Sequence, residues 1–431
     1  MATRKLRGKK MWIAVAAGAM AMTVLIVLVL NLTTGEKKIT KPLPGRYGVD
    51  DPQFLRTMGS LLGPSLVEGN SAEDFQNGDE IFPAMLAAIR GARQSICMES
   101  YIYWSGSVGK EFADALSERA RAGVSVHVLL DWVGSGKMDS GHLQMMSDAG
   151  VEVERYRPLR WYNVARTNNR THRKLLVVDG RIGFTGGVGI ADEWRGSARN
   201  PEEWRDSHYR FEGPMVAQMQ AAFLDNWIKT RSAVLDGPEY FPRISTAGTV
   251  TAQVFHSSKS GGGESVRLMY LLSIAAARRT IYLANSYFVP DDLAVDELVA
   301  ARRRGVRVQI IVPGGHIDTQ LVRHASHSRW RPLLAAGVEI FEYAPTMFHC
   351  KYMIVDGLWT TVGSTNFDNR SFRLNDEANA DVYDRAFAEE QERVFAADLA
   401  RSRQVALAQF DERPWRDKVL DHLAGLLRAQ L

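Results

Sequence analysis

Two short stretches of this chain carry residues suited to acid–base and nucleophilic chemistry on one small group. Both have the spacing His-x-Lys-x4-Asp, and in both the Asp is followed by Gly. The six residues are His172, Lys174 and Asp179 in the first copy and His349, Lys351 and Asp356 in the second. Imidazoles titrate near neutral pH, and ammonium groups supply positive charge. A single strand histidine beside a lysine is usually structural, but two copies with identical spacing predict a catalytic site.

The residues of each copy alternate as on a β-strand, which places the His and the Lys of that copy on one face. The Asp-Gly dipeptide is a strong hairpin-turn signal, so each strand should reverse there. After the second return strand the chain carries Ser364 and Asn366, whose side chains can donate hydrogen bonds to an anion.

If the two copies meet, they surround a single negatively charged centre, and a phosphodiester is such a centre. Phosphoryl transfer needs positioning and positive charge on the non-bridging oxygens, which Lys174 and Lys351 can supply. One histidine can attack phosphorus while the other, held in the opposite protonation state, protonates the leaving oxygen, which gives a phosphohistidine intermediate. This chemistry requires no metal or other cofactor. A zinc site on His172 and His349 is disfavoured, because the ammonium of the lysine two residues from each would repel the cation.

The two copies belong to a longer internal duplication. "RAGVSVHVLLD" from Arg121 is echoed by "RRGVRVQIIVP" from Arg303, and "AGVEVERYRP" is echoed by "AGVEIFEYAP". Helical patterns that end in Gly precede β-branched runs, which predicts strand-helix-strand units and an α/β fold. We expect a first half over residues 51–238 and a second over 239–400, packed about a pseudo-twofold axis with one active site between them.

The N-terminal region predicts a membrane anchor. Residues 1–10 are a basic tail, and residues 11–32 include twenty residues without a charge, which match a hydrocarbon core of about 30 Å. A cleaved signal peptide is the alternative, although its apolar region is shorter, roughly 7–15 residues. We expect a single-pass protein of the cell membrane with a cytoplasmic N-terminus, and a linker over residues 33–50.

Residues 401–431 predict a C-terminal amphipathic helix. Its apolar positions fall on one stripe, namely Trp415, Val419, Leu420, Leu423, Leu426 and Leu427. Packing of this stripe on the core is one interpretation, and contact with a membrane surface is the other.

Composition narrows the class of protein. A chain of 431 residues with 45% apolar and 24% charged residues is typical of a folded protein of two or three domains, not of a disordered or fibrous one. The net charge of +4 lacks the strong basic character of a nucleic-acid-binding groove. Two cysteines, Cys97 and Cys350, are too few for a disulfide framework, and we expect both to be buried.

The doubled motif resembles that of the phospholipase D superfamily. The segments "NNRTHRKLLVVDGRIGFTGG" and "VGSTNFDNRSFRLNDEAN" are similar to those of its bacterial cardiolipin synthases. The resemblance implies that His172 is the nucleophile and His349 the general acid and then base. It also implies that a later acidic residue orients an imidazole, and Asp206 and Glu377 follow the motif histidines by 34 and 28 residues. Where the family has Asn in its first Gly-Gly-x-Asn turn, this chain has Gly189.

The resemblance implies a membrane-anchored cardiolipin synthase of the bacterial inner membrane. Its substrate would be phosphatidylglycerol, with a phosphatidyl group passed between two molecules and glycerol released; phosphatidylethanolamine is an alternative donor. A phospholipase D-type hydrolase or a nuclease would use the same residues with water as acceptor. A membrane scaffold with decayed sites is the non-enzymatic alternative, and the intact motifs in both copies argue against it. The expected partners are phospholipids and the membrane, not nucleic acid.

Overall fold

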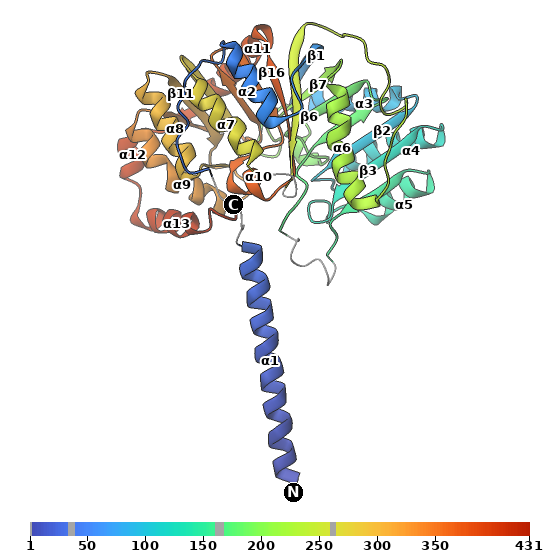
Figure 1. Ribbon diagram of the computed structural model, residues 1–431, viewed down its shortest axis with the longest axis vertical. Helices are drawn as coiled ribbons and strands as arrows, with labels where there is room; N and C mark the ends of the chain where they lie inside the picture. Colours follow the sequence, from blue (N-terminus) through green and yellow to red (C-terminus); the bar gives the residue numbers. More distant parts are fainter. Residues whose placement is uncertain (1, 33–38, 160–167, 259–263) are drawn as a thin grey trace.

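The computed structural model describes residues 2–32, 39–159, 168–258 and 264–431. Two α/β halves lie side by side, and α1 (Ala2–Leu32) projects away from them (Figure 1). Within α1, the stretch Lys10–Val29 is long and apolar enough to cross a membrane, and none of it is buried against the rest of the described chain. The predicted N-terminal apolar helix is therefore confirmed.

In the described residues, fifteen strands form one sheet whose two halves are built alike. From its outer edge inward, the first half consists of β4 (Glu152–Tyr156), β3 (Ser125–Asp131), β2 (Ser95–Ser100), β5 (Leu175–Val178), β6 (Ile182–Gly186), β7 (Ser207–Glu212) and β1 (Val67–Gln76). The second half follows the same order with β12 (Glu339–Tyr343), β11 (Arg307–Pro313), β9 (Thr280–Asn285), β13 (Lys351–Val355), β14 (Trp359–Gly363), β16 (Glu377–Tyr383) and β8 (Val250–Ser257). The halves join where β1 pairs antiparallel with β8. This mirrored order confirms the predicted duplication.

Matching helices accompany the strands of each half. In the first half these are α3 (Asn77–Gly91), α4 (Ser107–Arg121), α5 (Ser140–Asp148) and α6 (Val216–Arg231). In the second half they are α7 (Ser265–Ala276), α8 (Asp292–Arg303), α9 (Gln320–Ala335) and α11 (Arg385–Ala400). Short elements lie between these, namely η2 (Asp192–Trp194), β10 (Phe288–Val289), β15 (Phe367–Asp368) and α10 (Asn369–Arg373).

The sheet is buried on both faces. Along β2, Ile96 and Met98 belong to a core inside the first half, whereas Cys97 between them belongs to a core that crosses the junction. That crossing core joins Trp227 of α6 to Phe395 of α11. Burial on both faces explains why the strands read as continuous apolar runs in the sequence. The shared core fixes the two halves relative to each other.

The start of the chain's folded part crosses between the two halves, whose predicted boundary places residues 51–238 in the first half. The helix α2 (Pro52–Leu62) packs into the core of the second half instead. There the ring of Phe54 meets Trp359 edge-on, with centroids 5.0 Å apart. The apolar side chains of α2 find their partners across the junction, a contact that no local pattern encodes.

Residues 401–431 form more than the single predicted helix. They comprise β17 (Ser402–Gln404), which pairs with β12, then α12 (Leu407–Asp411) and α13 (Trp415–Leu426). The predicted apolar stripe lies on α13 and is exposed, while Asp421 and Ala424 are buried. The interpretation that the stripe packs on the core is therefore wrong.

Candidate active site

Each motif histidine lies in an extended segment at the start of a strand. His172 lies three residues before β5 begins at Leu175, and His349 lies two residues before β13 begins at Lys351. The strands are thus shorter than predicted. Each lysine side chain is still hydrogen-bonded to the backbone of the histidine in its own motif. The ammonium of Lys174 donates to the carbonyl oxygen of His172 at 2.9 Å. Lys351 does the same to His349 at 2.7 Å.

The two motif aspartates lie at the hairpin turns, as the Asp-Gly signal predicts, but away from the histidines. Asp179 and Asp356 have φ of +53° and +55°, in the left-handed region that such turns require. Their carboxylates accept backbone N–H groups at the start of the adjacent strand, from Arg93, Gln94 and Ser95 for Asp179 and from Arg278, Arg279 and Thr280 for Asp356. A strand of four or five residues at about 3.3 Å each separates them from the histidines. Contrary to the prediction, the structure does not bring Asp179 and Asp356 into the catalytic site.

Backbone pairing across the two halves builds the site. The N–H of His172 donates to the carbonyl oxygen of Asp376 at 2.8 Å. Reciprocally, the N–H of His349 donates to the carbonyl oxygen of Arg205 at 2.7 Å. Each motif histidine is therefore joined to the residue that precedes Glu377 or Asp206 of the other half.

Each imidazole is held by a carboxylate of the opposite half. Both oxygens of Glu377 lie 3.0 Å from Nδ1 of His172, and an oxygen of Asp206 lies 2.7 Å from Nδ1 of His349. A proton on Nδ1 shared with a carboxylate leaves the Nε2 lone pair available for chemistry. Burial alone would raise the pKa of both carboxyls, but the neighbouring histidine and lysine hold each pKa below its usual range.

The two carboxylates are held by different donors. The hydroxyls of Ser364 and Ser371 donate to Glu377 at 2.6 and 2.7 Å. In the first half the indole N–H of Trp194 donates to Asp206 at 2.8 Å. Ser364 was expected to donate to the substrate, and the structure assigns its hydroxyl to Glu377 instead.

Asn366 keeps a free donor. Its side-chain oxygen accepts from Ser286 at 2.8 Å, and within the described residues its amide nitrogen has no hydrogen-bond partner. This nitrogen is therefore available for the role that the sequence predicts for Asn366, donation to a substrate oxygen.

Burial lowers the pKa of both motif lysines. The pKa of Lys174 falls to about 7, with the charge of Lys351 adding to the effect of burial. The pKa of Lys351 falls to about 8, because Asp206 and Glu377 offset part of the effect of burial. The charge of Lys351 lowers the pKa of Lys174, and the charge of Lys174 lowers the pKa of His349 in the other half. The four motif side chains therefore share one site.

Both histidines are neutral at pH 7 when the site holds no substrate. Burial and the adjacent lysine lower the pKa of His172 to about 4 and that of His349 to about 3. The sequence predicted opposite protonation states for the two rings. In the structure, the two environments lower the pKa of both rings. A difference in protonation must therefore arise when an anionic substrate enters and raises the pKa of the ring that it contacts.

Packing explains the glycine that replaces the usual asparagine. A Cβ on Gly189 would lie 2.9 Å from Cβ of Ile102 and 3.1 Å from the Trp194 ring. A Cβ on Gly187, the counterpart of Ser364, would lie 2.1 Å from the Asp206 carboxylate. In the first half, Ile102, Trp194 and the Asp206 carboxylate thus occupy the space that the side chains of Asn366 and Ser364 occupy in the second half.

Aromatic contacts on the two histidines were not foreseen. Tyr101 meets the His172 ring edge-on with centroids 5.2 Å apart, and Trp194 and Trp204 lie 5.2 and 5.6 Å from His349. These aromatics exclude water from the rings and help to lower their pKa. The only sequence signal was their presence in the duplicated segments beside the motifs.

Comparison with known proteins identifies the family. The family profile described as "Cardiolipin synthase, PLD-like domain" matches residues 85–202 and 270–399. The chain belongs to this family. It is 34% identical over 363 residues to cardiolipin synthase 1 of Bacillus cereus, which covers 81% of this chain and 70% of the relative. The cardiolipin synthase of Geobacillus kaustophilus is also 34% identical, over 354 residues, with the same coverage.

A solved structure supports the fold. Phosphatidylserine synthase of Haemophilus influenzae superposes with a TM-score of 0.68 at 13% identity, over 88% of this chain and 100% of that chain. Each segment matched by the cardiolipin synthase profile contains one histidine motif. This member of the family is a phosphatidyltransferase of the phospholipase D superfamily, and its substrates are phospholipids.

Proposed function

We propose that this chain is a membrane-anchored cardiolipin synthase that transfers a phosphatidyl group from one phosphatidylglycerol molecule to another and releases glycerol. The crossed pair of histidines carries the proposal, since each ring is oriented by a buried carboxylate and lies beside its own lysine. Relatives with the name cardiolipin synthase support the choice of substrate.

In the first step, Nε2 of His172 attacks phosphorus and the bond from phosphorus to the glycerol oxygen breaks. Within the described residues this nitrogen has no hydrogen-bond partner, so it is free to attack. His349 gives its proton to the departing oxygen. Lys351 lies 3.1 Å from both ring nitrogens of His349, and its charge lowers the pKa of that ring, so His349 takes up this proton when the anionic substrate enters and raises the pKa.

In the second step, neutral His349 removes the proton from a hydroxyl of the second phosphatidylglycerol. The resulting oxygen attacks phosphorus, the bond to Nε2 breaks, and cardiolipin leaves with His172 restored. Lys174, Lys351 and the amide of Asn366 stabilise charge on the non-bridging oxygens in both steps. One phosphodiester replaces another, so no external energy source is needed.

The reaction is tested with detergent-purified protein and phosphatidylglycerol in the presence of a chelator. Lipids are followed by mass spectrometry, with His172→Ala as the control variant. We expect cardiolipin and free glycerol, both absent in the variant. Phosphatidic acid as the sole product would show that water is the acceptor and would replace this proposal with a hydrolase.

We further propose that α1 crosses the bacterial inner membrane once, with residues 1–10 in the cytoplasm. The proposal rests on the apolar stretch Lys10–Val29. Protease added to spheroplasts should digest the part of the chain that follows α1. Protection of that part would reverse the orientation.

A further inference from the structure

The last helix presents an apolar face that nothing in the described residues covers. Its six apolar side chains are 46–70% exposed, namely Trp415, Val419, Leu420, Leu423, Leu426 and Leu427. At about 100° per residue they cover roughly 140° of the helix circumference. The face is therefore as wide as the buried face of an ordinary amphipathic helix, and Arg416 falls within it at the first turn.

Polar contacts hold this face outward. Asp421, on the opposite side of α13, lies 2.8 Å from Nδ1 of His324 and 2.9 Å from the guanidinium of Arg413. Gly425 packs so closely on α9 that a Cβ there would lie 2.9 Å from the hydroxyl of Ser328. Rotation of the apolar stripe into the core would separate Asp421 from His324 and Arg413, so the exposure of the stripe is part of the folded state.

The end of α13 lies close to the end of the membrane-span candidate. Ile39 and Thr40 line one cavity of about 380 Å³ together with Arg428 and Ala429, which follow α13. The guanidinium of Arg267 donates to the carbonyl oxygen of Ile39 at 2.9 Å and fixes the chain there. From Leu32, where α1 ends, to Ile39 the chain reaches at most about 25 Å. A bilayer crossed by α1 therefore lies within that distance of Ile39, which lines the same cavity as the end of α13.

The same end of α13 is attached to the catalytic segment. The side chain of Asn168 donates to Gln430 at 2.8 Å, and the N–H of Arg370 donates to the carbonyl oxygen of Leu431 at 3.0 Å. Asn168 is four residues before His172. A surface that captures α13 would thus lie beside the nucleophile.

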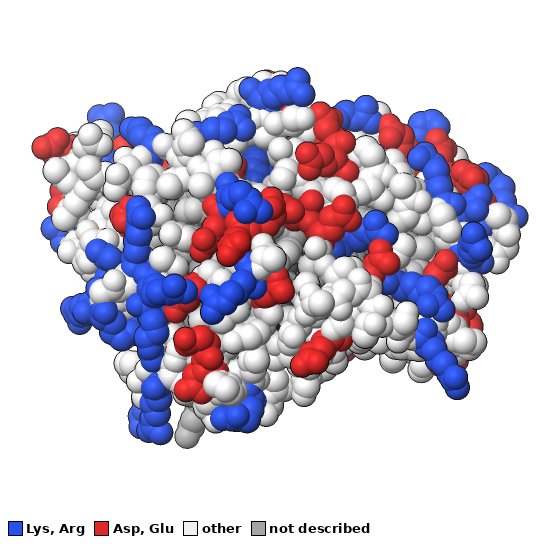
Figure 2. All heavy atoms as spheres, turned by 90° about the horizontal axis from the view of Figure 1, so that it is seen from above, with Lys and Arg blue, Asp and Glu red and all other residues white. Residues whose placement is uncertain are grey.

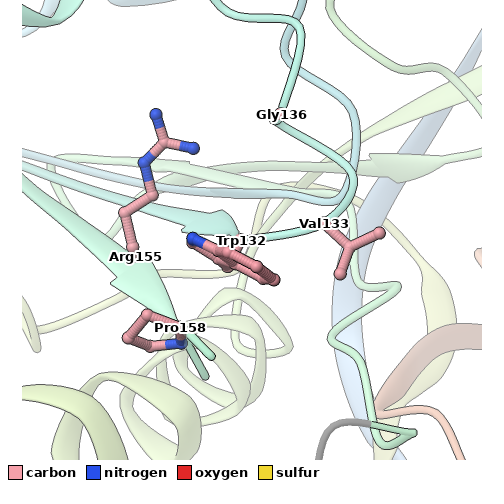
Figure 3. A pocket seen from close by; sticks show the side chains of 5 residues that line it. All are labelled: Trp132, Val133, Gly136, Arg155 and Pro158. Atoms are coloured by element: carbon pink, nitrogen blue, oxygen red, sulfur yellow. The ribbon is translucent and has the colours of Figure 1, made fainter. Parts of the chain in front are cut away.

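The first half also exposes apolar side chains, in the loop that follows β3. Trp132 and Val133 directly follow β3 and are 38% and 51% exposed. Figure 3 shows both side chains at an open pocket of about 700 Å³, with Pro158 and the guanidinium of Arg155 on the other side of the indole. The preceding residue, Asp131, accepts the N–H of Thr171 at 3.1 Å, which ties this pocket to the residue before His172.

The face that points away from α1 differs in its charge. Acidic side chains gather near the middle of the face that points away from α1 (Figure 2). Asp74, Glu389 and Glu390 lie around Arg393 of α11, at that end of the molecule (Figure 1). Anionic phospholipid would repel this acidic centre, which Lys and Arg side chains surround in the same view (Figure 2).

We propose that α13 and the Trp132–Val133 loop form a docking surface for the phospholipid bilayer, with α13 lying in the headgroup region on its apolar face. Membrane helices of this kind bind through buried apolar area beside basic residues, here Arg416 and Lys418. Docking places the two-histidine site at the lipid surface, so that a phospholipid headgroup enters while its acyl chains remain in the bilayer. The inference takes the position of the bilayer from the proposed anchoring by α1 and adds a second contact, which is tested separately.

Brominated lipids test this contact in the full chain. Leu423→Cys, Val133→Cys and a control, Glu389→Cys, are each labelled with a fluorophore, since the native cysteines are fully buried. In vesicles of phosphatidylglycerol and brominated phosphatidylcholine, we expect strong quenching at positions 423 and 133 and little at 389. Quenching at 423 no greater than at 389 overturns the proposal, including the case in which a second copy of the chain shields the label.

A label in α1 separates this result from the proposed anchor. Val24→Cys should be quenched if α1 spans the bilayer. Quenching at 24 without quenching at 423 rejects docking and leaves the anchor intact, whereas the reverse rejects the anchor and leaves docking intact.

Activity provides a second readout. Leu420→Glu combined with Leu423→Glu should lower turnover of vesicle lipid by about tenfold or more, because two charges would enter the apolar layer. Turnover of a short-chain, monomeric phosphatidylglycerol should be unchanged, since no bilayer is involved. Equal loss on both substrates would show a structural defect instead and contradict the proposal.

Discussion

Glu377 and His172 are 205 residues apart in the chain, yet both carboxylate oxygens of Glu377 lie 3.0 Å from Nδ1 of His172. Asp206 and His349 form the reciprocal pair at 2.7 Å. Each half therefore supplies a histidine for itself and an orienting carboxylate for its partner. Neither half has a complete site alone, which explains why one chain carries both copies.

The crossed pairing makes the two carboxylates testable as positioning residues. Glu377→Gln and Asp206→Asn should each lower kcat by about 100-fold or more with KM little changed, because the ring loses its tautomer and orientation rather than its place in the site. Steady-state kinetics on phosphatidylglycerol measures both parameters. Glu389→Gln on the surface of α11 is the matched control and should retain full activity.

Substitution of the turn aspartates should lower the stability of the protein and leave kcat unchanged. Asp179→Asn and Asp356→Asn weaken hydrogen bonds to backbone N–H groups and should cost about 1–3 kcal/mol of unfolding free energy each. The folded fraction should keep its kcat, because neither carboxylate reaches the histidines. A normal melting temperature combined with lost turnover would return these residues to the mechanism.

The lowered pKa values predict an unusual pH profile for kcat/KM. Since burial lowers the pKa of His172 to about 4, the nucleophile stays neutral well below the ordinary histidine range, and the acid side of the profile should remain high to about pH 5. As pH rises through about 7 and 8, Lys174 and Lys351 lose their protons and their hold on the phosphodiester, so kcat/KM should fall. A profile that instead declines below pH 6.5 would contradict the lowered pKa of His172.

Restoring the family asparagine should not improve the enzyme. Gly189→Asn places a Cβ 2.9 Å from Ile102 and should cost about 1–3 kcal/mol of stability through overpacking. Thermal unfolding measures this cost. Ile102→Ala in the same chain should recover part of the loss, and an equally stable single variant would show that the packing argument is wrong.

Much of the site could be predicted from the sequence because its signals are local. His172, Lys174, His349 and Lys351 share one spacing, and the Asp-Gly turns have a fixed backbone requirement that the sequence states directly. Duplication then predicted the α/β halves and the single shared site. The resemblance to the phospholipase D superfamily supplied Asp206 and Glu377, whose positions no spacing rule alone would have chosen.

The tertiary structure decided which of these groups meet. Only the junction of β1 and β8 and the reciprocal backbone pairing determine that Glu377 orients His172 rather than His349. Only packing decides that Ser364 donates to a carboxylate, or that α13 buries Asp421 and exposes its leucines. Spacing and residue type determine local geometry, but contacts between distant segments depend on how whole surfaces fit, which a one-dimensional pattern does not contain.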